Sequence, residues 1–168
     1  MRADAMRRRG AILATARRLF SEHGGDMPLE SIAQESGVGI ATLYRNFASR
    51  EELVLAVTAD TVEQILSAVE ECRGRLDVDA ALAWDALLDR LVCMELGALT
   101  DAFASWDADR SPDGARELQE RARLALEELL DELVRRGAVR GGLSALEVIV
   151  AVATVTRVQH EPIRLAAP

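Results

Sequence analysis

The first third of the chain carries three helical patterns of apolar residues. Residues 7–22 place one apolar stripe along a predicted helix, and residues 28–36 and 40–47 form two shorter ones. Only Gly37-Val38-Gly39 separates the two short helices, and Gly37 suits the left-handed backbone that follows a helix end. Two short helices at such a corner form a helix-turn-helix, the unit that lays its second helix in the major groove of DNA.

A long helix is predicted to follow this unit. Ser49 and Glu52 have the spacing of a capping box, so a new helix begins at Arg50, and apolar positions keep helical spacing as far as Arg73. About 24 residues at about 1.5 Å each span roughly 36 Å, enough to leave the head and enter the rest of the chain. The sequence therefore predicts a DNA-binding head over residues 1–49 and a helical body over residues 50–168.

The body is predicted to contain further helices. Apolar spacing predicts one helix over residues 78–99 and another from Pro112 to Arg136, after a loop that begins at Asp107. Residues 144–157 contain a β-branched run that also fits a buried strand. Ser144 and Glu147 form a second capping box, however, and the chain offers no partner strand, so we prefer a helix. The predicted fold class is all-α.

Charge is divided unevenly between the head and the body. The chain of 168 residues has a net charge of −8, which by itself argues against a nucleic-acid partner. Residues 1–50, however, carry eight arginines against five acidic residues, whereas residues 51–168 carry twelve against twenty-three. A basic module on an acidic body fits DNA binding at one end, because phosphate repels the rest of the chain.

Residues 32–54 carry a specific motif. They have the sequence IAQESGVGIATLYRNFASREELV, in which T-L-Y-x-x-F is the most specific part. This segment resembles the tetracycline-repressor (TetR) family, and the resemblance extends from about Arg9 to about Val57. The chain departs from the family pattern at Pro28, Gly39 and Asn46; Pro at a first helical turn and Gly as an N-cap keep the helix geometry. The resemblance implies a ligand-responsive transcriptional regulator, in most cases a repressor.

The second helix of the predicted helix-turn-helix has a buried face and an outward face. At roughly 100° per residue, Leu43 and Phe47 mark the buried face, and Ala41 and Arg45 fall on the opposite side. Arg45 is the best candidate for base readout, because a guanidinium can bond guanine O6 and N7 together. The alternative for Arg45 is a solvated side chain.

The neighbouring positions complete a predicted DNA-binding set. Ile40 and Ala41 can contact a thymine methyl group, while Thr42, Tyr44 and Arg50 fit phosphate contacts, which position the protein without specifying sequence. Core packing with a surface hydroxyl is the alternative for Tyr44. The resemblance places the DNA contacts on this same set: Ile40, Ala41, Thr42, Tyr44, Arg45, Asn46 and Arg50.

One helix pair can contact only half of a two-fold DNA site. A dimer on a pseudo-palindromic operator places its recognition helices one or more turns apart, at about 34–36 Å per turn. Residues 148–155 are apolar almost all round the predicted helix. One side can face its own core, and we expect a second copy of the chain to pack on the other. The sequence therefore predicts a homodimer on double-stranded DNA, held mainly by residues 118–136 and 144–157. Members of the family usually carry one more helix after this point, whereas the sequence here ends with HEPIRLAAP.

The body has more residues than a bare DNA-binding module needs. By resemblance, it binds a small effector that changes the spacing of the two heads. The large or adaptable side chains of the middle helices are the predicted lining of that site, with ordinary core packing as the alternative: Trp84, Leu88, Met94, Phe103 and Trp106. No convergent charge is visible among them, so we expect a small, largely apolar effector that releases a repressor from its operator.

Other classes of function and site are less well supported. Cys72 and Cys93 fit small buried hydrophobes in a reducing cytoplasm, but a regulator controlled by cysteine oxidation or by a protein partner is the alternative. A helical enzyme is disfavoured because no nucleophile, base and orienting group come together. We expect no cofactor and no metal, since the two histidines are scattered and Gly37-x-Gly39 lacks a third glycine. No signal peptide or membrane span is predicted, so the expected location is cytoplasmic.

Overall fold

The computed structural model describes residues 2–23, 27–94, 96 and 113–158. Throughout these residues the protein is helical and contains no strand, which confirms the predicted all-α fold. The helices are α1 (Arg2–His23), α2 (Leu29–Glu35), α3 (Ile40–Asn46), α4 (Arg50–Arg73), α5 (Leu76–Cys93), α7 (Asp113–Arg135) and α8 (Ala145–Val158).

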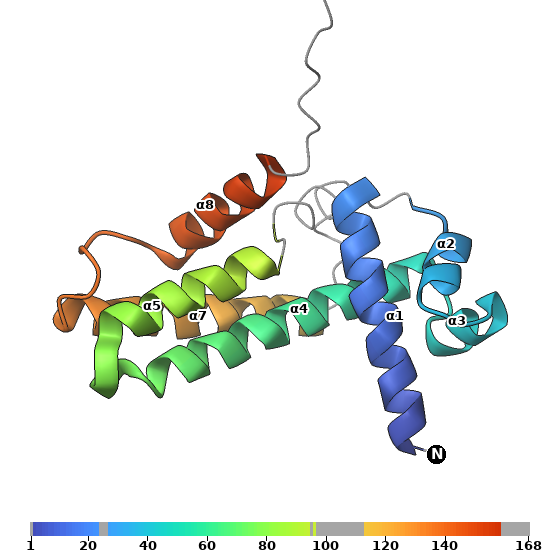
Figure 1. The fold of residues 1–168 in the computed structure, drawn as a ribbon, viewed down its shortest axis with the longest axis horizontal. Coiled ribbons are helices and arrows are strands. Elements are labelled where there is room, and N and C mark those ends of the chain that lie inside the picture. Colours follow the sequence, from blue (N-terminus) through green and yellow to red (C-terminus); the bar gives the residue numbers. More distant parts are fainter. Residues whose placement is uncertain (1, 24–26, 95, 97–112, 159–168) are drawn as a thin grey trace, which may run out of the picture.

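The head consists of α1, α2 and α3, with α1 lying across α4 (Figure 1). The corner between α2 and α3 is tight, because Gly37 adopts φ +70° and the Val38 N–H donates to the Ala33 carbonyl at 3.0 Å. Only a residue without a side chain takes this left-handed conformation at no steric cost. The head core is fully buried and contains two of the largest side chains in the protein, Phe20 and Phe47.

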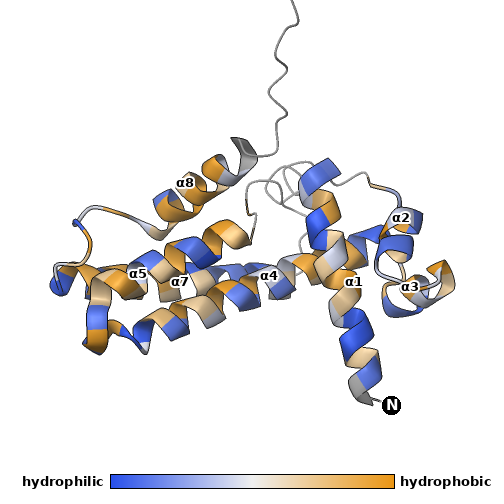
Figure 2. Cartoon of the chain, in the orientation of Figure 1, coloured by the Kyte–Doolittle hydropathy of each residue, from blue (hydrophilic) through white to orange (hydrophobic). Residues whose placement is uncertain are grey.

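Helix α4 runs from the head along the whole body (Figure 1). It begins as predicted, since Ser49 Oγ accepts the Glu52 N–H at 3.2 Å, and it ends at Arg73 with no Gly or Pro in its interior. In the body α4 packs against α5 and α7, and α8 packs on α5 and α7. Figure 2 shows hydrophobic residues concentrated on the body helices, with α8 among the most hydrophobic.

Several predicted boundaries differ from the structure. Helix α1 begins at Arg2, five residues before the predicted start, and α5 begins at Leu76. The predicted break before α5 is present as a kink, because Asp79 has extended φ and ψ and its carboxylate accepts the Leu82 N–H at 2.9 Å. Residues 97–112, which include most of the predicted loop, and residues 159–168 lie outside the described residues.

One apolar side of α8 is covered by its own body. Val152 is 6% exposed and Val148 is buried as well, because this side of α8 packs on α5 and α7. Val150 lies on the opposite side and is 53% exposed, and Val155, nearer the end of the helix, is 52% exposed. Helix α8 therefore has one face in the core of its own body and a second apolar face on the surface.

Candidate nucleic-acid interface and body cavity

The recognition helix α3 has the orientation that its sequence predicts. Leu43 and Phe47 are fully buried, whereas Ala41, Tyr44 and Arg45 are exposed. Tyr44 is therefore a surface residue. Ile40 is 37% exposed at the first position of the helix, where it projects outward instead of completing the buried face. Thr42 and Asn46 are half-buried beside this outward surface, as is Arg50 at the start of α4.

Two polar side chains of α3 are held along the helix itself. Arg45 Nε donates to the Ala41 carbonyl at 3.1 Å, which lays the guanidinium along the exposed face. Asn46 Nδ2 donates to the Thr42 carbonyl at 2.8 Å. These bonds use one donor of each group, and a guanidinium has five N–H donors. Arg45 thus keeps most of its N–H donors for a partner, whereas the Asn46 amide has already used one of its two.

Arg9 fixes the end of the recognition helix. Its guanidinium lies 4.3 Å from the centre of the Phe47 ring, and its Nη1 donates to the Asn46 carbonyl at 3.1 Å. A cation at this position both stacks on an aromatic face and bonds a terminal carbonyl of α3. Sequence reasoning did not identify this role, because 37 residues separate Arg9 from Asn46 and no local pattern joins them.

A small cleft of about 210 Å³ lies between α1 and α3. It is lined by Ala5, Arg8, Thr42, Arg45 and Asn46. Arg8 enters from α1, with its Nε bonded to the Asp4 carbonyl at 3.2 Å, and Arg45 enters from α3. Two guanidinium groups beside a hydroxyl and an amide suit an anionic oxygen such as that of a phosphate.

Two other arginines of α1 have partners within the protein. Arg18 binds Glu22 of its own helix at 2.8 Å and Glu35 of α2, and the hydrogen bonds to Glu22 and Glu35 raise the pKa of its guanidinium. Arg17 binds Asp60 and Gln64 of α4. Both side chains thus connect α1 to a neighbouring helix.

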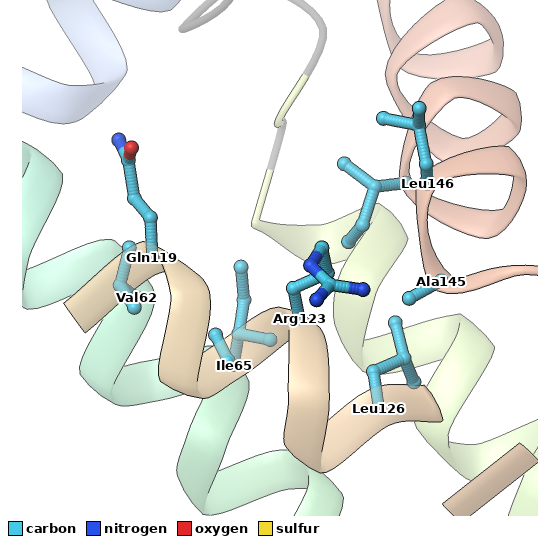
Figure 3. A pocket seen from close by; sticks show the side chains of 9 residues that line it. Val62, Ile65, Gln119, Arg123, Leu126, Ala145 and Leu146 are labelled. Atoms are coloured by element: carbon cyan, nitrogen blue, oxygen red, sulfur yellow. The ribbon is translucent and has the colours of Figure 1, made fainter. Parts of the chain in front are cut away.

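The body contains an apolar cavity of about 360 Å³ between α4, α7 and α8 (Figure 3). Its nine lining residues are Val62, Ile65, Gln119, Ala122, Arg123, Leu126, Ala145, Leu146 and Ile149. Arg123 is held by Glu120, with Nη2 to Oε1 at 2.6 Å, and its Nη1 lies 3.7 Å from Glu127. The bonds to Glu120 raise the pKa of Arg123, and the carboxylates of Glu120 and Glu127 offset its positive charge. The cavity therefore offers apolar walls and little free charge.

Of the residues predicted to bind a ligand, those that the structure describes do not line this cavity. Trp84 and Leu88 are half-buried and pack against the core, and Met94 is buried. Phe103 and Trp106 lie outside the described residues. The set remains a prediction, and the cavity provides a second candidate, formed by small and aliphatic side chains. The sequence signal was a stretch of large or adaptable side chains, whereas this cavity depends on how three helices are spaced.

The cysteines differ in environment. Cys72 is buried, and burial raises the pKa of its thiol, which disfavours the reactive thiolate. Cys93 is exposed. Among the described helices, none combines the length and apolar character needed to cross a membrane.

The sequence and the fold are both similar to known regulators. Residues 12–57 match the family described as "Bacterial regulatory proteins, tetR family". The crystal structure of a TetR transcription regulatory protein from Mycobacterium vanbaalenii shares 30% identity, with 95% of this chain and 96% of that chain covered and a TM-score of 0.66. A TetR transcriptional regulator from Streptomyces coelicolor shares 31% identity over 92% and 87% of the two chains, with a TM-score of 0.67.

A curated relative adds a match of smaller extent. An uncharacterized HTH-type transcriptional regulator of Mycobacterium tuberculosis is 34% identical over 87 residues. This match covers 51% of the chain and 40% of the length of that relative.

Proposed function

Because the chain belongs to the TetR family of helix-turn-helix transcriptional regulators, we propose that it represses transcription by binding a specific operator as a homodimer. A small effector in the body releases it from the DNA. The observation that supports sequence-specific binding best is the outward face of α3, where Ala41, Tyr44 and Arg45 are exposed beside a buried Leu43. We place this activity in the bacterial cytoplasm, where the chromosome is accessible.

In this proposal some side chains of the head contact base edges and others contact the sugar–phosphate backbone. Arg45 bonds a guanine edge in the major groove, and Ile40 and Ala41 contact a thymine methyl group. Thr42, Tyr44, Asn46 and Arg50 contact the sugar–phosphate backbone or support the helix that does so. Arg8 joins them, because it shares the cleft between α1 and α3 with Arg45.

Substitution of two arginines tests the DNA-binding assignment. Arg45→Ala should weaken binding to an operator selected from random duplexes by about 1–3 kcal/mol and relax preference at one base step. Arg50→Ala should weaken binding to all duplexes similarly and lower the salt slope by about one unit. Arg121→Ala, an equal charge change on the exposed surface of α7, is the control and should change neither. Equal loss of specific and non-specific binding in Arg45→Ala would contradict the assignment.

The homodimer is supported by the exposed apolar face of α8. Leu146 and Val150 lie one turn apart on this face and are each more than half exposed, and Leu143, just before the helix, is exposed as well. A second copy that packs on this face removes these side chains from water and places two heads on one duplex. The contact extends to exposed apolar positions of α7, namely Leu124 and Val134.

The effector site is the cavity between α4, α7 and α8. Its walls are mainly aliphatic, and the Arg123 charge is already balanced by Glu120 and Glu127. An uncharged, largely apolar molecule is therefore the preferred effector, since a carboxylate ligand would compete with two acidic side chains for one guanidinium. Control by oxidation of Cys72 is not favoured, because its thiol is buried and its pKa is raised.

A further inference from the structure

Arg17 of α1 is tied to α4 by a closed set of three side chains, here called the Arg17 network. Arg17 Nη1 donates to Gln64 Oε1 at 3.0 Å, and Nη2 forms an ion pair with Asp60 Oδ2. Gln64 Nε2 donates to the same Asp60 oxygen at 2.9 Å. The Arg17 side chain is only 15% exposed, so water and salt screen this ion pair less than the surface pairs of the protein.

The same two turns of α4 form a wall of the body cavity. Val62 and Ile65 line the cavity, and they lie roughly 150° around the helix from Asp60 and Gln64 at about 100° per residue. In Figure 3 both apolar side chains belong to the α4 side of the cavity, opposite α8. A molecule that presses on Val62 and Ile65 therefore pushes on a segment whose other face holds α1.

The Arg17 network has an unused donor. Within the described residues, Arg17 Nε is buried and has no hydrogen-bond partner, which destabilises the present arrangement. Nε and Nη2 form one edge of a guanidinium, and this edge can bond both oxygens of a carboxylate. A shift of α4 that brings Asp60 alongside this edge would satisfy Nε. Such an arrangement would supply the second state that a two-state element requires.

We propose that the Arg17 network is the joint through which occupation of the cavity moves the DNA-binding head. This inference rests on the proposed function, in which the cavity holds the effector. Helix α1 packs on α2, and Arg9 of α1 holds the end of α3, so a movement of α1 carries the recognition helix with it. Arg17 is a positioning residue: it acts through Asp60 and contacts neither DNA nor effector.

The test measures how strongly cavity occupation changes DNA binding. The probe is N-phenylnaphthylamine, an uncharged apolar dye whose fluorescence rises in apolar sites, and the DNA is a duplex selected from random sequences by the wild-type protein. In the wild type, saturating dye should weaken operator binding about 5–150-fold. In Arg17→Gln the dye should bind with wild-type affinity, but operator binding should change less than twofold. Arg18→Gln, which removes an equal charge one residue along and breaks contacts only within the head, should respond as the wild type does.

The outcomes separate the joint from the proposed effector site. If Arg17→Gln responds to the dye as fully as the wild type, the Arg17 network is not the joint, and the effector site stands. If the dye does not bind the wild type, or binds without changing its operator affinity, both the effector site and the joint are contradicted. Should Arg17→Gln fail to fold, as judged by its thermal transition, Asp60→Asn removes the same ion pair and carries the same test.

Discussion

The recognition helix α3 and the last helix α8 expose opposite kinds of surface. Helix α3 buries Leu43 and turns Arg45 outward, in a head with more arginines than acidic residues. Helix α8 buries Val152 and turns Val150 outward, on a body with a large excess of acidic residues. A charged, hydrated partner such as DNA suits the first surface, and an apolar protein surface suits the second. Each end of the molecule is therefore built for a different partner.

The largest expected effect separates the two faces of α8. Val152→Glu should prevent folding of the body, because it places an unpaired carboxylate in the core. Val150→Glu should leave the far-UV circular dichroism unchanged but give monomers in sedimentation velocity at micromolar concentration. A dimeric Val150→Glu protein would show that the exposed face of α8 is not the interface.

The head core should be nearly as sensitive as the body core. Phe47→Ala removes a fully buried ring and the platform beneath Arg9, so it should lower the free energy of unfolding by about 3–5 kcal/mol. Tyr44→Ala is the matched aromatic control on the same helix, and it should change stability by less than about 1 kcal/mol because Tyr44 is exposed. Denaturant titrations measure both, and similar losses would contradict the assigned faces of α3.

Two arginines of α1 should have different salt dependence. Arg8→Gln should reduce the slope of operator affinity against salt concentration by about one unit, since Arg8 faces the cleft proposed for phosphate. Arg9→Gln should leave this slope unchanged and instead lower stability by about 1 kcal/mol, because Arg9 stacks on Phe47 and bonds a carbonyl of α3. If operator affinity depends on salt equally in Arg8→Gln and Arg9→Gln, the different roles assigned to the two arginines are contradicted.

The smallest expected effect concerns the capping box of α8. Ser144 Oγ accepts the Glu147 N–H at 3.2 Å, and the Ser144 N–H donates to Glu147 Oε2 at 2.8 Å. These bonds from Ser144 hold the pKa of Glu147 below its ordinary value. The part of the stabilisation that comes from the charged Glu147 carboxylate is therefore complete above about pH 4.3, the unperturbed Glu pKa. It is lost as pH falls through the lower pKa of the folded protein. Ser144→Ala should cost about 1 kcal/mol near neutral pH and less below that window in urea titrations.

The head could be predicted from sequence in more detail than the body. Gly37 and the buried Leu43 follow from local rules, because turn chemistry and helical periodicity act within a few residues. The environment of Val152 could not be predicted, since helical spacing does not say which side of an apolar helix meets its own core. The Arg9–Asn46 and Arg17–Asp60 contacts join residues far apart in the chain, so only the packed helices bring them together.

The position of Leu146 connects the two proposed equilibria of this regulator. Leu146 lines the body cavity, and it is also 67% exposed on the face of α8 proposed for dimerisation. If effector binding and subunit association both use this side chain, any effect of one on the free energy of the other is reciprocal. The apparent effector affinity is then expected to depend on protein concentration. The amount of this regulator in a cell would in that case help to set the effector level at which it responds.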